Sequence, residues 1–330
     1  MNKIFRKHEF YIAVIIVVLS IVIGLLNNAF FSRANMFNLM KSCVVMGIMA
    51  LGAMLVLISG GIDISFTAIS VFAMYVTTKI LTSYNYSGTI LLAFIMSAII
   101  GGGLGLINAF FISKYKLPPL IVSLGTMNAY RGFLLGFIGK SWINQLPPSM
   151  LDFSKNYFFK SVTESGKTVG FHFSIFILLA IILIVWFLMR KTTLGRSIYA
   201  MGGNRAAAER AGFKIPRIQI FIYSFVGLLA GIAGIIHCSN IRAANPFDIV
   251  GTEMNVIAAV VLGGTSLSGG RGTVIGTILG VVLITMVNNS LIILGIPSYW
   301  QKLVTGFIIV IATGVTAFRE TREKKRILRA

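Results

Sequence analysis

Acidic residues are the scarcest groups in this sequence that could carry out chemistry. The chain has nine Asp and Glu residues, and Asp63 lies inside an apolar stretch, within residues 59–65 (SGGIDIS). If this stretch enters a membrane, an ionised carboxylate at its centre costs about 2.5–3.5 kcal/mol on insertion scales. Two interpretations stay open: Asp63 lies on a polar pathway, or Asp63 and Ser65 cap the helix that follows the paired glycines.

A second charged residue, Arg131, also lies inside an apolar stretch, after residues 124–128 (LGTMN). It follows Pro118 by thirteen residues. At a rise of 1.5 Å per residue, this places Arg131 about 20 Å from the start of a helix, in the outer half of a membrane. Its side chain extends outward to the lipid headgroups, faces a polar pathway together with Asn128, or pairs with a carboxylate.

A glycine-rich segment at residues 262–273 (LGGTSLSGGRGT) does not suit a regular helix and includes Ser266 and Ser268. Its glycines resemble those of a phosphate-binding loop, but no Lys-Ser/Thr pair follows at the required spacing. The Gly166-Lys167-Thr168 sequence fails as well, because position 161 is Ser. We therefore predict that this chain does not bind ATP through such a loop.

The other reactive side chains form no recognisable set. His8, His172 and His237 lie far apart at the ends of apolar stretches, and Cys43 and Cys238 lack the spacing of a metal site. No Ser-His-Asp or Cys-His arrangement stands out. We predict that the chain is not an enzyme and holds no metal or cofactor.

The composition places the chain in a membrane. It is 56% hydrophobic and 12% charged, whereas a soluble domain carries about 25% charged residues. The apolar runs reach 17 to 20 residues, which suits helices rather than strands. The net charge of +20 comes from basic residues at the ends of these runs and in a few loops, so it favours membrane orientation over nucleic-acid binding.

Ten apolar stretches predict ten spans in one transmembrane domain, residues 1–330. The fold class is an all-α polytopic bundle, and five plus five spans would give two inverted halves. The eighth stretch is short and glycine-rich at its end, so it could be re-entrant or broken. Gly276 and Gly280 in the ninth are spaced for close helix packing. The predicted spans are residues 10–26, 39–58, 66–82, 88–113, 118–139, 172–190, 217–238, 254–268, 273–294 and 300–318.

Most Lys and Arg residues fall on one side of the membrane if the N-terminus is cytoplasmic. They lie mainly near the two termini and in the loop at residues 191–216, which predicts that both termini are cytoplasmic. That loop contains a good helix former, residues 206–210, between Gly202-Gly203 and Gly212. The loop at residues 140–171 lies outside and is predicted to be polar and partly irregular.

Four segments of the chain resemble the permease subunit of ribose-type ABC sugar importers, a binding-protein-dependent transport family. The resemblance extends over residues 40–318, and the last two segments are long and specific. Two departures stand out: Phe66-Thr67 replaces a usual Val-Gly, and Glu253-Met254-Asn255 replaces a usual Glu-Leu-Asp. The segments are residues 59–65, 118–132 (PPLIVSLGTMNAYRG), 195–212 (GRSIYAMGGNRAAAERAG) and 263–280 (GGTSLSGGRGTVIGTILG).

The resemblance implies a function that composition does not. Two permease subunits, either two copies or a related pair, form a pathway for a sugar or sugar-like solute in a prokaryotic plasma membrane. Two cytoplasmic ATPase domains, supplied by an ABC ATPase subunit, bind the ATP, and an extracytoplasmic sugar-binding protein delivers the solute. The alternative is a secondary active carrier, which would need intramembrane carboxylates for its coupling ion.

The resemblance also assigns candidate roles to individual residues. The candidate pathway residues are Asp63, Ser65, Asn128, Arg131, Ser266 and Ser268. The candidates for coupling to the ATPase are Gly195, Arg196, Gly202, Gly203, Asn204, Ala208 and Gly212.

Overall fold

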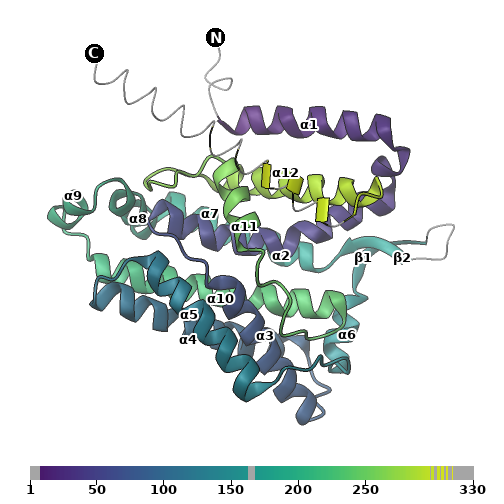
Figure 1. Ribbon diagram of the computed structural model, residues 1–330, viewed down its shortest axis with the longest axis horizontal. Coiled ribbons are helices and arrows are strands. Elements are labelled where there is room, and N and C mark those ends of the chain that lie inside the picture. Colours follow the sequence, from purple (N-terminus) through teal and green to yellow (C-terminus); the bar gives the residue numbers. More distant parts are fainter. Residues whose placement is uncertain are drawn as a thin grey trace.

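The computed structural model describes residues 8–162 and 168–297, together with residues 299, 300, 303, 304, 306, 307, 310 and 314. Helices make up most of it, and a small two-stranded sheet lies at one end (Figure 1). The elements are α1 (His8–Leu26), η2 (Asn28–Phe31), α2 (Arg33–Ile58), α3 (Phe66–Ser83), α4 (Ile90–Lys114), α5 (Pro119–Phe133), η3 (Leu134–Ile138), α6 (Pro148–Ser154), β1 (Tyr157–Val162), β2 (Thr168–His172), α7 (Ser174–Lys191), α8 (Thr193–Gly203), α9 (Arg205–Arg210), α10 (Ile215–Ile241), α11 (Glu253–Leu262) and α12 (Val274–Ile293).

Eight helices in the described part of the chain are long and apolar enough to cross a membrane. They correspond to the first seven predicted spans and to the ninth, which confirms the all-α polytopic bundle. The span predicted at residues 300–318 falls largely outside the described residues, so the total of ten stays a prediction. Helix α2 begins at Arg33 rather than at residue 39, because Ser32 caps it by accepting a hydrogen bond from the Asn35 amide.

The eighth predicted span is shorter than expected. Helix α11 has ten residues and ends at Leu262, where residues 254–268 were predicted to be helical. Ten residues extend about 15 Å, half of the roughly 30 Å hydrocarbon core. The helix stops because Gly263 and Gly264 turn the chain, so the predicted helical length is wrong, and the choice between a re-entrant and a broken helix stays a prediction.

Helix α2 forms the centre of the bundle. Every residue from Gly47 to Ile58 is buried, on all sides of the helix. It packs against α7, α10, α11 and α12. A helix that is apolar all round fits such a fully enclosed position.

Helices α4 and α10 approach each other most closely. Gly101 and Gly105 of α4 face Gly227 and Gly231 of α10, and a Cβ atom at any of these glycines would overlap a backbone carbonyl of the other helix. The Ser97 hydroxyl donates to the Gly231 carbonyl at 2.8 Å across the same contact. Small residues four apart let two membrane helices meet at backbone distance.

The predicted packing glycines of α12 make a second contact of this kind. A Cβ at Gly276 would overlap the Gly263 carbonyl, and one at Gly280 would overlap the Ala259 carbonyl. Ala259 belongs to α11, and Gly263 caps the end of that helix. The structure therefore confirms that Gly276 and Gly280 allow close helix packing.

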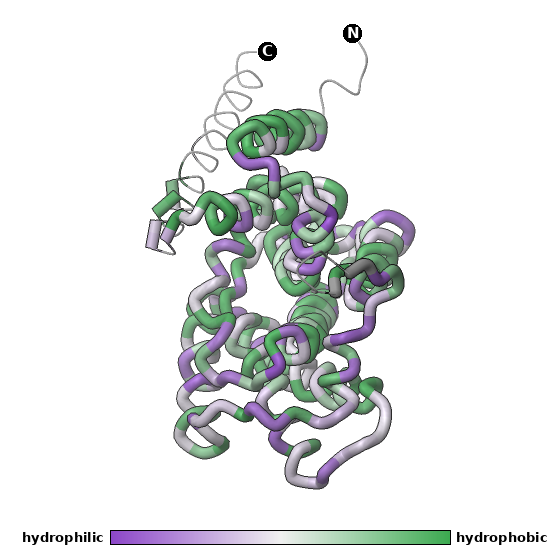
Figure 2. The backbone as a smooth tube through the Cα atoms, turned by 90° about the vertical axis from the view of Figure 1, so that its right-hand side faces the viewer, coloured by the Kyte–Doolittle hydropathy of each residue, from purple (hydrophilic) through white to green (hydrophobic). Residues whose placement is uncertain are grey.

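Helix α1 lies at the edge of the bundle and contacts mainly α12. It is mostly green, the hydrophobic colour, at the top of Figure 2. Most of its large apolar side chains are exposed, which fits a helix surrounded by lipid on several sides. They are Tyr11, Val14, Ile15, Val17, Val18, Ile21, Val22, Leu25 and Leu26.

The two ends of the bundle differ. We call the end with α8 and α9 the α8 end, and the opposite end, with α6, β1 and β2, the hairpin end (Figure 1). The loop predicted to be irregular at residues 140–171 contains α6 and the antiparallel pair β1–β2. The sequence analysis missed α6, although Pro148 in its first turn favours a helix start there.

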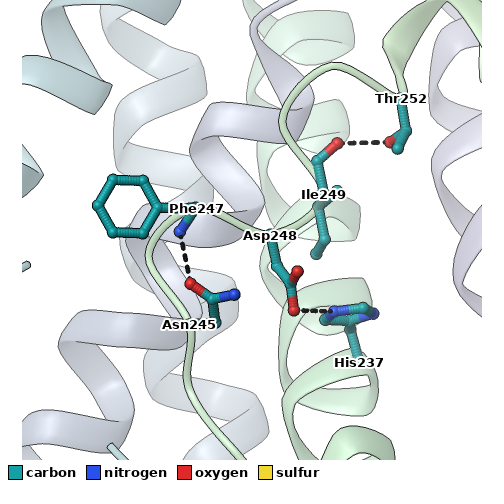
Figure 3. A network of polar contacts seen from close by, with 6 residues as sticks. All are labelled: His237, Asn245, Phe247, Asp248, Ile249 and Thr252. Atoms are coloured by element: carbon teal, nitrogen blue, oxygen red, sulfur yellow. Dashed lines mark hydrogen bonds and ion pairs between the residues drawn. The ribbon is translucent and has the colours of Figure 1, made fainter. Parts of the chain in front are cut away.

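A polar network holds the chain at the hairpin end between α10 and α11. His237 near the end of α10 lies 3.2 Å from a carboxylate oxygen of Asp248 (Figure 3). Asn245 accepts a hydrogen bond from the Phe247 amide, and Thr252 donates to the Ile249 carbonyl. The hydrogen bond from His237 lowers the pKa of Asp248, although partial burial opposes this shift. The network orders a loop that leads directly into α11.

Candidate functional site

The four motif segments meet at the α8 end. They line one cavity of about 360 Å³, together with residues of α10 that include the buried Gln219 and Tyr223. The segments are far apart in sequence, so the fold and not local structure brings them together. The motif residues at the cavity are Ser59, Gly60, Gly61, Pro118, Pro119, Met201, Gly202, Arg205 and Ser268.

The first motif forms a break between α2 and α3. Helix α2 ends in a glycine turn. The Gly60 amide donates a hydrogen bond to the Leu57 carbonyl, and the Gly61 amide donates one to the Val56 carbonyl. Gly60 has a φ of +84°, which a residue with a side chain rarely adopts. The buried Ile58 accepts a hydrogen bond at its carbonyl from the Gly270 amide at 2.8 Å. The end of α2 is therefore closed in part by the fourth motif.

The fourth motif forms a second break, between α11 and α12, with the same turn. The Gly264 amide donates a hydrogen bond to the Val261 carbonyl, and the Thr265 amide donates one to the Val260 carbonyl. Gly264 has a φ of +91°. The chain then loops through residues 265–273 before α12 begins. Both breaks lie at the α8 end, where irregular backbone needs protein or water around it.

Asp63 is buried between the first break and α3, with 3% of its surface exposed. One carboxylate oxygen accepts hydrogen bonds from the Ser65 amide and the Ser65 hydroxyl, both at 2.7 Å. The Ser65 hydroxyl in turn accepts from the Asn108 side chain at 2.7 Å, and the Tyr130 hydroxyl lies 3.2 Å from Asn108. These contacts support the helix-capping interpretation of Asp63, while its place on a pathway stays a prediction.

Ser65 does not cap α3 with its own side chain, because its hydroxyl is turned to Asp63. The turn is instead held by the carboxylate two residues earlier, as is common for Asp before a helix. Asn108 and Tyr130 were not predicted. Neither residue type is unusual in a membrane helix, so only the fold reveals that they complete this network.

A second buried carboxylate, Glu253, escaped the sequence analysis as a site residue. It starts α11 and accepts a hydrogen bond from Thr67 at 3.2 Å and from the Gly251 amide at 2.8 Å. Thr67 is one of the departures from the family motif. The departure was a usable signal, because a hydroxyl that replaces glycine in a buried helix needs a partner.

Asn128 and Arg131 lie apart from Asp63, on an exposed face of α5. The Asn128 side chain donates to the Leu124 carbonyl of its own helix at 2.9 Å. A Cβ atom at Gly125, Gly132 or Gly136 would meet no described atom within 4 Å. This face of α5 therefore includes glycines and polar side chains, and the described chain does not cover it.

Ser266 and Ser268 belong to the loop of the second break. Their hydroxyls lie 3.2 Å apart, and the Ser266 amide donates to the Arg271 carbonyl at 3.0 Å. Ser266 is buried, while Ser268 is exposed at the cavity. The predicted pathway residues thus fall into three groups: Asp63 with Ser65, Asn128 with Arg131, and Ser266 with Ser268.

The predicted coupling loop contains two helices rather than one. Helix α9 includes the predicted residues 206–210, and α8 ends at Gly203 just before it. Thr192 caps α8 by accepting from the Gly195 amide, and Asn204 caps α9 by accepting from the Ala207 amide at 2.9 Å. Gly203 and Gly212 flank α9 as predicted, and the helix that was not predicted is α8, which ends with the glycine pair.

The candidate coupling residues divide into an outward and an inward set. Arg196, Gly203 and Asn204 are exposed, whereas Gly195 and Ala208 are buried and Gly202 faces the first break. Gly212, with a φ of +87°, forms the turn after α9. An ion pair between Arg205 and Glu209, 3.3 Å apart, spans one turn of α9.

A family model described as "Branched-chain amino acid transport system / permease component" matches residues 35–313. The chain therefore belongs to this family of permeases. It is a multi-pass membrane protein and a transport component rather than an enzyme, as predicted.

Curated relatives within the family are more specific in their names. The chain is 37% identical to the ribose import permease protein RbsC of Bacillus subtilis, over 89% of this chain and 88% of the relative. It is 33% identical to RbsC of Escherichia coli over 90% of each chain. The autoinducer 2 import system permease protein LsrC of Yersinia pseudotuberculosis is 31% identical, over 92% of this chain and 82% of LsrC. No solved structure gave a significant match. The predicted likeness to ribose-type permeases is confirmed.

Proposed function

We propose that this chain is the permease subunit of an ATP-driven importer for a sugar or sugar-like solute. The observation that carries this proposal is that both helix breaks meet the exposed α8–α9 segment at one end of the bundle. A partner that displaces α8 can thereby act on the interrupted membrane helices. ATP is bound and hydrolysed by that partner, since the sequence contains no phosphate-binding loop.

The α8 end faces the cytoplasm in this proposal, and so do both termini. Basic residues gather there at the end of α7 and along the following loop, as the positive-inside rule requires. They are Arg190, Lys191, Arg196, Arg205, Arg210, Lys214 and Arg217. The hairpin end then faces the extracytoplasmic binding protein that delivers the solute.

A second permease copy covers the exposed face of α5. Asn128 and Arg131 on this face are unfavourable in contact with lipid hydrocarbon, and the glycines beside them leave room for a solute or a second helix. The pathway in this proposal runs between the two α5 faces. Their polar groups replace the hydrogen bonds that a sugar loses with its water.

Ribose is the first solute to test, because relatives that import ribose or autoinducer 2 resemble the chain over most of its length. The complete complex, with its ATPase and binding protein, would be reconstituted in proteoliposomes. Uptake of labelled ribose should require ATP and the binding protein, and unlabelled pentoses, hexoses and furanose-like signals should be compared as competitors. Uptake driven by an ion gradient without ATPase would instead identify a secondary carrier.

A further inference from the structure

We infer that Gly202 is the contact through which α8 moves both broken segments of the bundle, an assignment that rests on the proposed function. The contact consists of backbone meeting backbone, and we call it the glycine junction. It comprises Gly60 of the first break, Gly202 and Gly203 of α8, and Gly269 and Gly270 of the second break.

Gly202 lies where α8 reaches the end of α2. A Cβ atom on Gly202 would overlap the Ile58 carbonyl and would lie 2.7 Å from the Gly270 amide nitrogen. These are the two groups that hydrogen-bond to each other at 2.8 Å. Gly202 therefore packs directly on the bond that joins the first break to the second.

The second break meets α8 with equally little space. A Cβ atom on Gly269 would lie 2.7 Å from the Gly202 carbonyl oxygen and 2.9 Å from the Gly60 Cα. One on Gly270 would lie 2.9 Å from the Gly203 Cα. Gly269 and Gly270 both have positive φ, at +86° and +72°, which favours glycine for a second reason.

A hydrogen bond ties the same loop to α8 one turn earlier. The Tyr199 hydroxyl donates to the Gly272 carbonyl at 2.8 Å. The loop of the second break is thus attached to α8 at two points, the backbone contact at Gly202 and the side chain of Tyr199. Displacement of α8 along or across its axis must carry this loop with it.

Backbone contact matters for coupling because the backbones cannot absorb a displacement of α8. Two surfaces of long side chains can absorb a small displacement by changing rotamers, whereas close-packed backbones transmit it. The adjacent Gly203 differs, because a Cβ there would meet no described atom within 4 Å. Gly203 therefore faces the space where an ATPase would bind, and Gly202 faces the membrane helices.

The test measures sugar moved per ATP hydrolysed by the complete complex in proteoliposomes. Gly202→Ala should lower this ratio about ten-fold, the equivalent of a 1.4 kcal/mol change, while the ATPase still co-purifies with the permease. Gly269→Ala, which alters the junction from the other side, should lower it similarly. Gly103→Ala on α4, where a Cβ meets no described atom within 4 Å, is the control and should leave the ratio unchanged.

Tyr199→Phe keeps the test decisive if the alanine variants do not fold. It removes one hydroxyl and adds no atom. It should lower the ratio two- to five-fold, the effect expected from the loss of about one hydrogen bond. Wild-type ratios in Gly202→Ala and Gly269→Ala, or in Tyr199→Phe when the alanine variants are not obtained, would overturn the inference. If the wild-type complex itself showed no ATP-driven uptake, the proposed function would fail instead.

Discussion

Two groups of glycines bring backbones together in this molecule, and they differ in what surrounds them. Between α4 and α10, four glycines lie on regular helices and form one continuous contact inside the bundle. At the glycine junction, the glycines lie in turns with positive φ and at a helix end, and they join three separate segments. The first contact runs along two helices, and the second is confined to the point where three segments meet.

The same residue type therefore supports stability in one place and transmission in the other. The α4–α10 contact has no adjacent break, so disturbing it should separate two helices that hold the bundle together. The glycine junction lies beside two breaks and a cavity of about 360 Å³, so the segments there have room to move. Variants of the two groups should therefore fail in different measurements.

The largest effect is expected for Gly227→Leu in α10. The added side chain would overlap the backbone of α4 at Gly101 and Gly105, and overpacking of this kind costs about 3 kcal/mol or more. The thermal midpoint of the purified protein in detergent should fall sharply, with loss of assembled complex. Gly103→Leu, on the open side of α4, should retain the wild-type midpoint, and an equal fall in both variants would contradict a specific helix contact.

A smaller loss is expected when the first break loses its own polar support. Asp63→Ala leaves the Ser65 amide and hydroxyl without their acceptor, at a cost of about 1–3 kcal/mol. Asp63→Asn keeps one acceptor oxygen and should recover most of the stability. Unfolding measured by denaturant for both variants tests this order, and uptake measured alongside would show whether the charge itself is needed for transport.

The helix that follows the junction should be less sensitive. Asn204→Ala removes the side-chain cap of α9, a change worth about 1 kcal/mol. Because α9 lies beyond the junction and is exposed, the midpoint should hardly change, while binding of the ATPase should weaken. Asn204→Ser keeps a capping oxygen and should bind normally; if both variants bound equally well, α9 would not belong to the ATPase interface.

The sequence predicted the helices well and their breaks in part. Long apolar runs identify spans because lipid leaves a chain few alternatives, which is why α1, α3, α4 and α7 end within a few residues of their predicted bounds. Paired glycines identified both breaks. The length of α11 was overestimated because the predicted span continued past the glycine turn at Gly263-Gly264 to Ser268, where Leu267 is the one large apolar residue.

The candidate site was less predictable, since it depends on contacts between distant segments. The pathway candidates are polar residues in apolar stretches of the sequence. The structure places them in three groups that lie apart from one another. The sequence contains only weaker signals of these contacts. One is Thr67, which departs from the family motif and bonds to Glu253. The other is the pair Gly202-Gly203, of which Gly202 is closely packed and Gly203 is open. One glycine of a pair is indistinguishable from the other until the fold supplies its neighbours.

The smallest effect is expected far from both glycine groups, in the network of His237 and Asp248 (Figure 3). The pKa of Asp248 is lowered in the folded protein, so the pair stabilises the fold above the ordinary carboxyl pKa of about 4. This contribution is lost as the pH falls through the lower, folded value. Because the carboxylate is about one-third exposed, solvent screening keeps the contribution below about 1 kcal/mol.

Asp248→Asn should therefore lower the thermal midpoint slightly at pH 7 and by progressively less as the pH falls below about 4, with the wild-type protein as the reference at each pH. Sugar moved per ATP should not change, since this network lies at the hairpin end and touches neither glycine group. A coupling defect in Asp248→Asn as large as that expected for Gly202→Ala would mean that transmission extends through α10 to the hairpin end. The distinction between a stabilising contact along α4 and α10 and a transmitting one at Gly202 would then no longer hold.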